Sequence, residues 1–461
     1  MDSTFYILGV SVLKSKNVDM LSGPITKGLL TMIVPIMIMN VSQSLFNILD
    51  MTILKIFNFS TAVGAVGASS SLISLCTCLL IGLAAGANVI VANRIGKKQR
   101  DRADKAAMTA LLVALIGGVF LMTIGVVFAE TFLGMINCPD ELLPQAAKYF
   151  RLYFLGLPAI MIYNFSASIL RAIGDTKRPM YYLIIGGVVK VVSTIVFLLI
   201  FNEGVLAAGL AIIASNTVAF ALTFRRLIKS KEHISINFKE IRLDIIELKA
   251  ILLQGIPAGL QTSFYSLANT LIAATVNSFG PAATTGIAIA NQFDGLIYQI
   301  VFAPSLATIP FISQNIGAGN INRVKKIIKS SMLITAAFGV TFGSLSAIFS
   351  KQLSSLMSGD PEVIAFSQQK MILVSSLYFI AGINEVMGGI LKGMQKPLPP
   401  AITSLVYMCG LRFVWIYLIF PLMPSLTFLY TVWPVGWILS LITLFIIYRI
   451  NMSPIQKQLA Q

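Results

Sequence analysis

Apolar stretches long enough to cross a membrane recur along the whole chain, and they restrict the fold more than any other feature. An α-helix rises about 1.5 Å per residue, so about 20 apolar residues span a hydrocarbon core of about 30 Å. Reading between the loops, we expect spans near 28–54, 62–91, 106–129, 147–170, 180–201, 205–224, 251–277, 282–314, 330–350, 364–391, 400–420 and 428–448. Pro304 and Pro310 either kink the eighth span or end it early. The predicted fold class is an all-α integral membrane protein with twelve transmembrane helices.

The composition agrees with this class and excludes several functions. Hydrophobic residues make up 56% of the chain and charged residues 11%, and the mean hydropathy is +0.85, which is unlike a soluble domain. The net charge of +16 lies in short loops rather than on a soluble basic face, so no nucleic-acid partner is expected. His233 is the single histidine, the cysteines lack metal-ligand spacing, and no Walker-type loop occurs. We therefore predict no enzyme activity, no metal and no bound cofactor.

The basic residues are distributed unevenly between the two sides of the predicted spans. Of the 34 lysines and arginines, 27 fall on one side and two, Lys190 and Arg412, lie within spans. The five on the other side are Lys55, Lys148, Arg151, Lys351 and Lys370. Because basic loops stay in the cytoplasm, we predict a protein of the bacterial inner membrane with both termini cytoplasmic.

An internal repeat divides the chain into two halves. Pro35 matches Pro257, Asn47 matches Asn269, and Pro179 matches Pro400, at an offset of 221–222 residues. Both halves begin and end on the same side, so the repeat is parallel, with a pseudo-two-fold axis along the membrane normal. We predict two six-helix lobes, 24–224 and 251–450, with a substrate cleft between them.

Three shorter segments lie outside the predicted lobes. Residues 1–23 are expected to form a cytoplasmic extension, because their apolar run precedes Lys14 and Lys16, the reverse of the order in a signal peptide. The linker 225–250 is expected in the cytoplasm, and within it residues 234–248 form either a short amphipathic helix or a solvated loop. Residues 451–461 are predicted to be a cytoplasmic tail.

Five charged residues fall inside predicted spans, where each costs at least about 2.5–3.5 kcal/mol and therefore requires a partner or a task. They are Asp50 and Lys190 in the first lobe and Asp294, Glu385 and Arg412 in the second. Residue counts place Asp294 and Arg412 near the middle of their spans, so we predict that these two form an ion pair. Glu385 either shares Arg412 or faces a water-filled cavity. The set in the second lobe is either a structural ion pair or part of a substrate or coupling site.

Several motifs occur in an order and at spacings that resemble one known family. They are Val34-Pro35 followed by Phe46-Asn47-Ile-Leu-Asp50, Leu170-Arg-Ala-Ile-Gly-Asp-Thr-Lys177, and Ser313-Gln-Asn-Ile-Gly-Ala-Gly319. The chain resembles the multidrug and toxic compound extrusion (MATE) transporters, and within them the DinF-like bacterial branch. The resemblance implies export of amphipathic, cationic compounds in exchange for protons or sodium ions.

The resemblance also implies a coupling site, from which this sequence departs. Asp50 matches the family's cation-linked carboxylate near the end of the first helix. The fifth helix of the family usually carries an asparagine and, four residues later, an aspartate, where this chain has Lys190 and Thr194. An ammonium group beside Asp50 would take the place of a bound sodium ion. We therefore assign cation coupling to Asp50, Lys190 and Thr194 and expect protons rather than sodium.

The remaining expectations concern substrates, partners and competing functions. Residues expected to line the cleft are Met37, Asn47, Asn269, Phe264 and Tyr265. The expected partners are small amphipathic substrates and membrane lipid, and the chain is expected to be a monomer. One alternative is a flippase or dedicated exporter of a lipid-linked precursor or metabolite, and another is a non-transporting membrane scaffold. A cleft rich in basic side chains would favour the flippase, whereas a costly charge pair within the spans argues against the scaffold.

Overall fold

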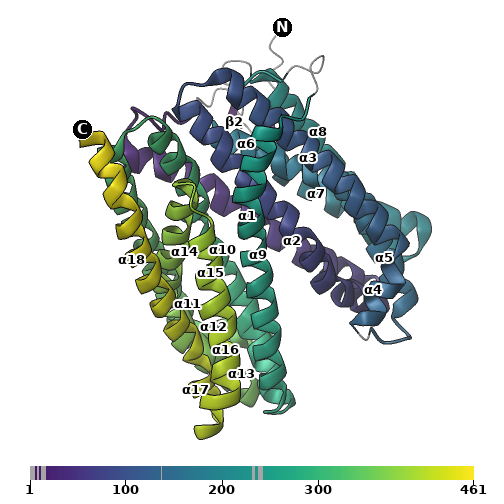
Figure 1. Cartoon of the computed structure of the whole chain (residues 1–461). Helices are drawn as coiled ribbons and strands as arrows, with labels where there is room; N and C mark the ends of the chain where they lie inside the picture. Colours follow the sequence, from purple (N-terminus) through teal and green to yellow (C-terminus); the bar gives the residue numbers. More distant parts are fainter. Residues whose placement is uncertain are drawn as a thin grey trace. The chain divides into compact units, whose positions relative to one another are not determined.

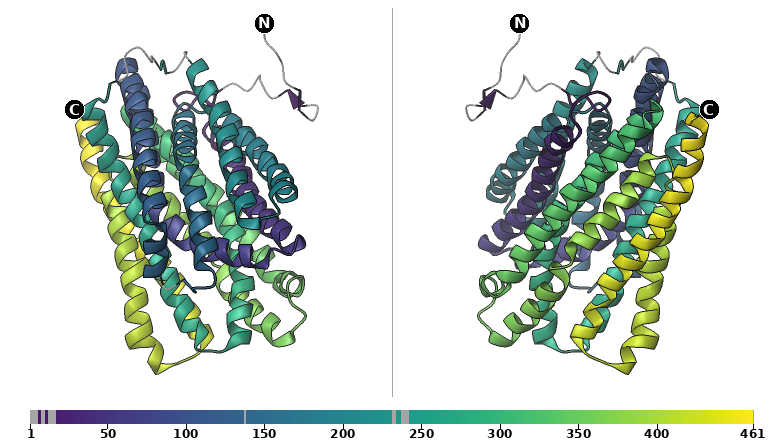
Figure 2. Two further views of the ribbon diagram at one scale, coloured as in Figure 1. Left: turned by 90° about the vertical axis from the view of Figure 1, so that its right-hand side faces the viewer. Right: turned by 90° about the vertical axis from the view of Figure 1, so that its left-hand side faces the viewer.

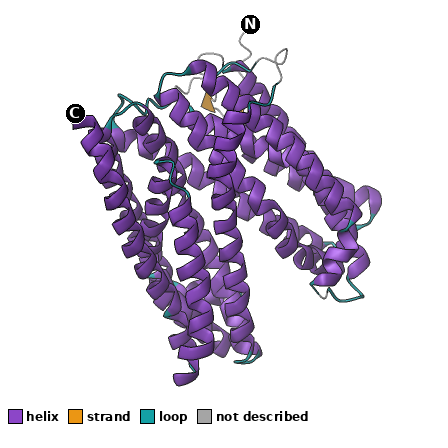
Figure 3. Ribbon diagram, viewed as in Figure 1, coloured by secondary structure: helices purple, strands orange, loops and turns teal. Residues whose placement is uncertain are grey.

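A computed structural model describes residues 6–7, 10–11, 17–136, 138–230, 234–236 and 242–460. Helices make up nearly all of these residues, as Figure 3 shows. The two described strands, β1 (Tyr6–Ile7) and β2 (Val10–Ser11), form one short antiparallel pair. An apolar segment in lipid must satisfy its backbone hydrogen bonds internally, which an α-helix does. The predicted all-α fold class is confirmed.

The chain divides into two compact units. The N-terminal unit consists of Met1–Gly23 and Leu30–Gly255, and the C-terminal unit of Pro24–Leu29 and Ile256–Gln461. Each unit holds most of one half of the repeat. The first helix of each half, α1 (Ile25–Ile56) or α9 (Ile245–Asn277), contributes residues to both units. The lobe and linker bounds expected from the sequence stay a prediction.

The N-terminal unit contains the larger part of α1 and seven further helices (Figure 1). These are α2 (Ser60–Gly96), α3 (Arg100–Val127), α4 (Ala129–Met135), α5 (Leu143–Leu155), α6 (Leu157–Ala172), α7 (Lys177–Phe201) and α8 (Gly204–Lys229). The span predicted at 147–170 is a bent pair, since α5 and α6 meet at 46°. Pro158, at the start of α6, supplies no backbone N–H, so it favours a break at this place.

The C-terminal unit contains more helices because several of its spans are interrupted. After α9 come α10 (Pro281–Gly317), α11 (Ile321–Ile348), α12 (Ser350–Ser355), α13 (Pro361–Lys370), α14 (Tyr378–Gly393), α15 (Leu398–Thr403), α16 (Leu411–Val414), α17 (Leu426–Tyr430) and α18 (Val432–Ala460). Three π-helical segments and one 3₁₀ turn join some of them: η2 (Met371–Ser375), η3 (Ser404–Gly410), η4 (Trp415–Ile419) and η5 (Phe420–Leu422). Helix α10 continues through Pro304 and Pro310, so the early end allowed for this span is not observed.

The number of spans agrees with the predicted arrangement. Within the described residues, nine helices are long and apolar enough to cross a membrane, and two bent pairs raise the number to 11. The second bent pair is Pro361–Ser375 with Tyr378–Gly393, at 48°. Helix α9, with 33 residues, corresponds to the one other predicted span, at 251–277.

One π-helical segment explains an irregularity of the repeat. The offset between matching residues is 221 at Pro179 and Pro400, but it is 222 at Lys190 and Arg412. Segment η3 lies between these two positions of the second half. A π turn closes its hydrogen bond over one residue more than an α turn. The additional residue is therefore accommodated in the π-helix without removing Arg412 from its place in the repeat.

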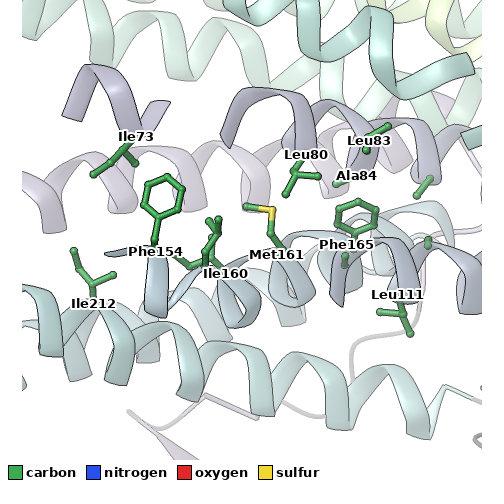
Figure 4. Close-up of a cluster of buried hydrophobic side chains, with 14 of the residues drawn as sticks. Ile73, Leu80, Leu83, Ala84, Leu111, Phe154, Ile160, Met161, Phe165 and Ile212 are labelled. Atoms are coloured by element: carbon green, nitrogen blue, oxygen red, sulfur yellow. The ribbon is translucent and has the colours of Figure 1, made fainter. Parts of the chain in front are cut away.

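The core of the N-terminal unit is built from side chains of α2, α3, α5, α6 and α8 (Figure 4). Phe154, Met161 and Phe165 are essentially unexposed, and Figure 4 places them among Leu80 of α2 and Leu111 of α3. In the views of Figure 2 the helices within each unit run alongside their neighbours. Large apolar side chains are exposed on both units, as expected where lipid is the solvent.

The described part of the linker packs against the N-terminal unit. Ile234 is unexposed and Ile236 nearly so, and both belong to the core of that unit. The backbone N–H of Ser235 donates to Asp104 Oδ1 at 2.7 Å. Residues 234–236 are not helical and α9 begins at Ile245, so an amphipathic helix over the whole of 234–248 is wrong. Residues 237–241 and His233 lie outside the described part of the chain.

Candidate functional site

The charges predicted in the N-terminal unit lie together. Asn47 and Asp50 are three residues apart on α1, and Lys190 and Thr194 are four apart on α7, so each pair lies on one helix face. The Lys190 ammonium is 3.3 Å from Asp50 Oδ2 and also donates to Asn47 Oδ1 at 3.2 Å. The Thr194 hydroxyl donates to Asp50 Oδ1 at 2.7 Å. Both carboxylate oxygens therefore have a partner, one a cation and the other a neutral hydroxyl.

A glycine allows α1 and α7 to approach each other at this place. A Cβ atom at Gly187 would lie 2.0 Å from Cε2 of Phe46, closer than any side chain could tolerate. Phe46 directly precedes Asn47, and Gly187 is less than one turn from Lys190. The close contact of this ring with bare backbone therefore positions the Asp50 and Lys190 side chains within ion-pair distance.

The arrangement around Asp50 is largely removed from solvent. The exposed fraction is 7% for the Asp50 side chain and 12% for that of Lys190, while Thr194 is fully buried. The ammonium of Lys190 and the hydroxyl of Thr194 are the two partners of this carboxylate. Taking up a proton would remove the charge that Lys190 pairs with. Binding of one proton to Asp50 would therefore break one ion pair at this site.

The ion pair predicted between Asp294 and Arg412 is wrong. Asp294, on α10, pairs with Lys370 at the end of α13, where Oδ2 and Nζ are 3.0 Å apart. Ser375, the last residue of η2, donates to Asp294 Oδ1 at 2.8 Å, and Lys370 also bonds Asn291. Lys370 had been counted among the outer basic residues, but its side chain is 3% exposed. Residue counting failed because it estimates only the depth of a side chain along its span, and it does not say which neighbouring helix that side chain faces.

Arg412 has an uncharged partner instead. It is 3% exposed, and its Nη1 donates to Asn269 Oδ1 at 2.7 Å. This contact repeats the one between Lys190 and Asn47. The two residues of each pair are 143 positions apart, and each residue of the second pair follows its match in the first by 222 positions. The guanidinium also lies over the Trp433 ring, 5.5 Å from its centroid, and Lys370 Nζ lies 5.5 Å from the same centroid. Two cations thus contact one indole.

Glu385, on α14, does not share Arg412. Its Oε1 accepts hydrogen bonds from the hydroxyls of Tyr265, at 2.9 Å, and Tyr298, at 3.4 Å. Within the described residues it forms no ion pair. The predicted Tyr265 therefore contacts a buried acid. The cleft-lining role of Met37, Asn47, Asn269, Phe264 and Tyr265 stays a prediction, and Met37 and Phe264 are half-buried.

Sequence reasoning missed three residues of the C-terminal cluster, which are Lys370, Ser375 and Trp433. A signal for part of the arrangement was present, because the repeat that matches Asn47 to Asn269 also matches Lys190 to Arg412. Applying the same offset to both members would have predicted the Arg412–Asn269 contact. No sequence pattern marks Trp433 as the ring between two cations. The described residues contain no cluster of histidine, cysteine, aspartate or glutamate that could hold a metal ion.

Comparisons with known proteins agree with the repeat and the fold. The family model MatE matches the chain twice, over residues 35–196 and 257–418, which is more than half of its length. The "Probable multidrug resistance protein YpnP" of Bacillus subtilis is 27% identical over 401 residues, 86% of this chain and 89% of the relative. The "FAD transporter" of Shewanella oneidensis is 24% identical, over 84% of this chain and 86% of the relative. A solved "outward-facing conformation of a multidrug resistance MATE family transporter of the MOP superfamily" has a TM-score of 0.86, with 19% identity, 96% of this chain and 99% of that one covered.

The two matches of the family model begin and end 222 residues apart, as the sequence repeat does. A relative that carries a multidrug-resistance name matches 86% of the chain, and the fold matches a solved transporter over 96% of it. This chain belongs to the multidrug and toxic compound extrusion family and is a multi-pass membrane transporter.

Proposed function

We propose that this transporter exports small amphipathic compounds, cationic ones included, by antiport with protons rather than sodium ions. It acts as a monomer in a bacterial inner membrane with both termini in the cytoplasm, and it catalyses no reaction. The observation that carries the coupling proposal is the position of the Lys190 ammonium, 3.3 Å from Asp50 Oδ2. Relatives named for multidrug resistance support the direction of transport and the breadth of the substrates.

Coupling follows from the competition between a proton and Lys190 for Asp50. With Asp50 charged, Lys190 and Thr194 hold α7 against α1 through the two carboxylate oxygens. A proton on Asp50 removes the ion pair, and the ammonium is left with Asn47 Oδ1 as its acceptor in this cluster. The two protonation states therefore favour different arrangements of α1 and α7, which is what a transporter needs to link proton binding to a change of conformation.

Protons are favoured over sodium because the cation position is already occupied. A sodium site needs several oxygen ligands around a vacant position, and here the Asp50 and Asn47 oxygens face an ammonium instead. A second cation beside Lys190 would also be repelled by it. The competing account is a static salt bridge that only braces the unit. A flippase or a dedicated metabolite exporter would differ in substrate rather than in this site.

The test uses the purified full chain reconstituted in liposomes with an imposed pH gradient. Asp50→Asn should abolish gradient-driven efflux of ethidium while ethidium binding stays measurable, because the variant keeps a hydrogen-bonding side chain but cannot lose or gain the proton. Asp101→Asn is the matched control, since this exposed carboxylate pairs with Lys105 on the surface of α3. Efflux at the wild-type rate by Asp50→Asn would show that the pair is static.

A second variant addresses the choice of ion. Lys190→Asn places an amide where the family usually has one, so sodium ions should gain access to the Asp50 oxygens. We expect efflux by Lys190→Asn to become partly dependent on a sodium gradient, which is measured with and without sodium at constant pH. Unchanged indifference to sodium would mean that Lys190 is not what excludes the ion.

Orientation is tested separately by labelling single cysteines from outside the cell. Ser235, in the linker, should be protected, and Asp140, in the loop between α4 and α5, should be accessible. Equal labelling of Ser235→Cys and Asp140→Cys from outside would contradict the proposed topology.

A further inference from the structure

The C-terminal unit buries a positive charge that no carboxylate of the described residues pairs with. Arg412 is 3% exposed, and Asn269 is the hydrogen-bond acceptor that it contacts. Within the described residues no carboxylate oxygen lies within 4.0 Å of its guanidinium. A buried cation without an opposite charge nearby raises the free energy of the folded state, whether it lies inside the protein or within the membrane. The repeat-related Lys190 differs, because Asp50 balances it.

The surroundings of Arg412 hold more donors than acceptors. Trp433 has the Lys370 ammonium and the Arg412 guanidinium each 5.5 Å from its ring centroid. Within the described residues, the carboxylate paired with either cation is Asp294, which Lys370 contacts. The Tyr430 ring is 6.1 Å from that of Trp433, and in the described part of the chain the Tyr430 hydroxyl is buried without a hydrogen-bond partner. The same holds for the indole N–H of Trp415 among the described residues. The two cations beside Trp433 thus share one paired carboxylate, and two buried donors of this unit are unused.

The backbone around Arg412 is also unusual. Helix α16 is four residues long, and π-helical segments precede and follow it. Such segments are frequent at functional sites, because they shift the side chains of one turn away from regular helical positions. The matching helix α7 is regular from Lys177 to Phe201. The segment η3, which accommodates the additional residue of the second half, keeps Arg412 at the position from which it contacts Asn269.

We propose that Arg412, beside Trp433, binds the carboxylate or phosphate group of the transported compound. This inference rests on the proposed export function and adds to its substrates amphiphiles that carry an anionic group, alone or together with a cationic one. A guanidinium stacked on an aromatic face keeps its edge N–H groups available, and these can form a bidentate contact with a carboxylate or a phosphate. Trp433 is half-buried, so its other surface can contact the apolar part of the same compound.

Two fluorescent dyes that differ by one anionic group provide the test. Rhodamine 110 carries a free carboxylate and rhodamine 123 is its methyl ester, and both have the same cationic ring system. Binding of each dye to the purified full chain in neutral detergent is measured by fluorescence anisotropy, with no ion gradient. A contact between a guanidinium and a carboxylate is charge-assisted, so we expect rhodamine 110 to bind about tenfold or more tightly than rhodamine 123. Equal affinities of the wild-type chain for the two dyes would overturn the proposal without any variant.

The variants assign that preference to Arg412. Arg412→Gln should bind both dyes with the affinity that the wild type shows for the ester, whereas Arg412→Lys, which keeps the charge, should retain a preference for the acid. Lys148→Gln removes a positive charge from a half-exposed pair with Glu203 and is the matched control, so it should leave the ratio unchanged. Loss of affinity for both dyes to the same extent in Arg412→Gln would indicate a structural role.

A final experiment tests whether the anionic group bound by Arg412 belongs to the transported compound or to a lipid. Rhodamine 110 binding is repeated in nanodiscs of phosphatidylcholine and of phosphatidylglycerol. Similar affinities in both lipids support the proposal, while loss of the acid preference in phosphatidylglycerol would show that a lipid headgroup occupies Arg412. Because these measurements need no transport, a failure of Asp50→Asn to block efflux would leave this result standing. A loss of the dye preference would likewise leave the coupling test intact.

Discussion

The two halves of the chain hold a cation and an asparagine at matching positions, but they surround that pair differently. In the N-terminal unit, Lys190 contacts Asn47 and also Asp50. In the C-terminal unit, Arg412 contacts Asn269, and an isoleucine, Ile272, stands where the repeat would place the carboxylate. The contact between a cation and an asparagine therefore occurs in both halves, whereas the acidic partner is present in one half.

This difference separates two kinds of chemistry. A cation beside a carboxylate can be released when the carboxylate takes up a proton, so the N-terminal cluster can respond to pH. An arginine beside an amide stays charged at any physiological pH, so its positive charge is permanent. Thr194, the second partner of Asp50, is matched by Ile416. Both residues that would make the C-terminal pair respond to protons are thus replaced by apolar side chains.

The largest expected effect comes from comparing the buried ion pair of the C-terminal unit with a half-exposed ion pair of the N-terminal unit. Lys370→Met leaves Asp294 buried without its cation, which should cost about 3–5 kcal/mol. Lys148, within one residue of the matching position, pairs with Glu203 at 2.6 Å, but both side chains are more than 40% exposed. Lys148→Met should therefore cost at most about 1 kcal/mol. Thermal unfolding in detergent, followed with a thiol-reactive dye, measures both, since three of the four free cysteines are buried.

The double variant Asp294→Asn/Lys370→Met supplies the control for this comparison. It removes both charges, so it should unfold at a higher temperature than Lys370→Met. Equal midpoints for the double variant and for Lys370→Met would mean that the charge of Asp294 is not what destabilises the single variant.

The next effect concerns the close approach of α1 and α7, which forms the N-terminal cluster. Gly187→Ala puts a methyl group where Phe46 now lies, so it should cost about 1–3 kcal/mol and separate Asp50 from Lys190. Phe46→Leu in the same chain should recover part of the loss by making room. The measurements are the unfolding midpoint and ethidium efflux under a pH gradient. If Gly187→Ala transports normally, the short Asp50–Lys190 distance is not needed for coupling.

The comparison of the two units also shows what a sequence can and cannot predict. The apolar spans and the parallel repeat were predicted, because residue types and their spacing along the chain determine them. Asp50 and Lys190 were recognised as charges within spans, and the resemblance to the family added Thr194. The pair of Asp294 with Arg412 was wrong, because the depth of a residue in its span does not determine which neighbouring helix its side chain faces. Bends and π-helical segments change which side chains meet, and they arise from packing between helices rather than from a local pattern.

The linker gives a second example of the same limit. Its isoleucines suggested either a separate amphipathic helix or a solvated loop, yet Ile234 packs into the core of the N-terminal unit. An apolar period identifies a face that will be buried, but not the surface that buries it. The destination of Ile234 depends on α3 and its Asp104, which hydrogen-bonds the adjacent peptide.

A smaller effect is expected at the start of α9, where the halves differ in another way. Glu247 is fully buried and pairs with Arg94, at 3.1 Å, and with Arg102, at 3.3 Å. The matching residue of the first half is Ile25, so α1 has no such anchor. Glu247→Gln keeps a hydrogen bond but loses the charge, which should cost about 1.5 kcal/mol. Ile25→Val is the control and should shift the unfolding midpoint less, so an equal shift would contradict an anchoring role for Glu247.

The smallest effect on stability is expected from a variant in which one residue of the N-terminal cluster resembles its counterpart in the other half. Thr194→Val replaces the hydroxyl by a methyl group, as Ile416 does in the other half, and should cost about 0.5–1.5 kcal/mol.

The effect of Thr194→Val on Asp50 should be easier to detect than its effect on stability. The hydroxyl donates to Asp50 Oδ1 at 2.7 Å, so the variant leaves that oxygen without this donor. A carbodiimide attacks at a carboxyl oxygen, so Thr194→Val should be labelled at Asp50 faster than the wild type, and Thr194→Ser should label at nearly the wild-type rate. Labelling of Asp294 by the same reagent serves as the internal reference, because Ser375 and Lys370 still hold that carboxylate in both variants. If Asp50 and Asp294 are labelled at the same relative rates in Thr194→Val as in the wild type, the hydroxyl does not hold the Asp50 carboxylate, and the difference between the two units depends on Asp50 alone.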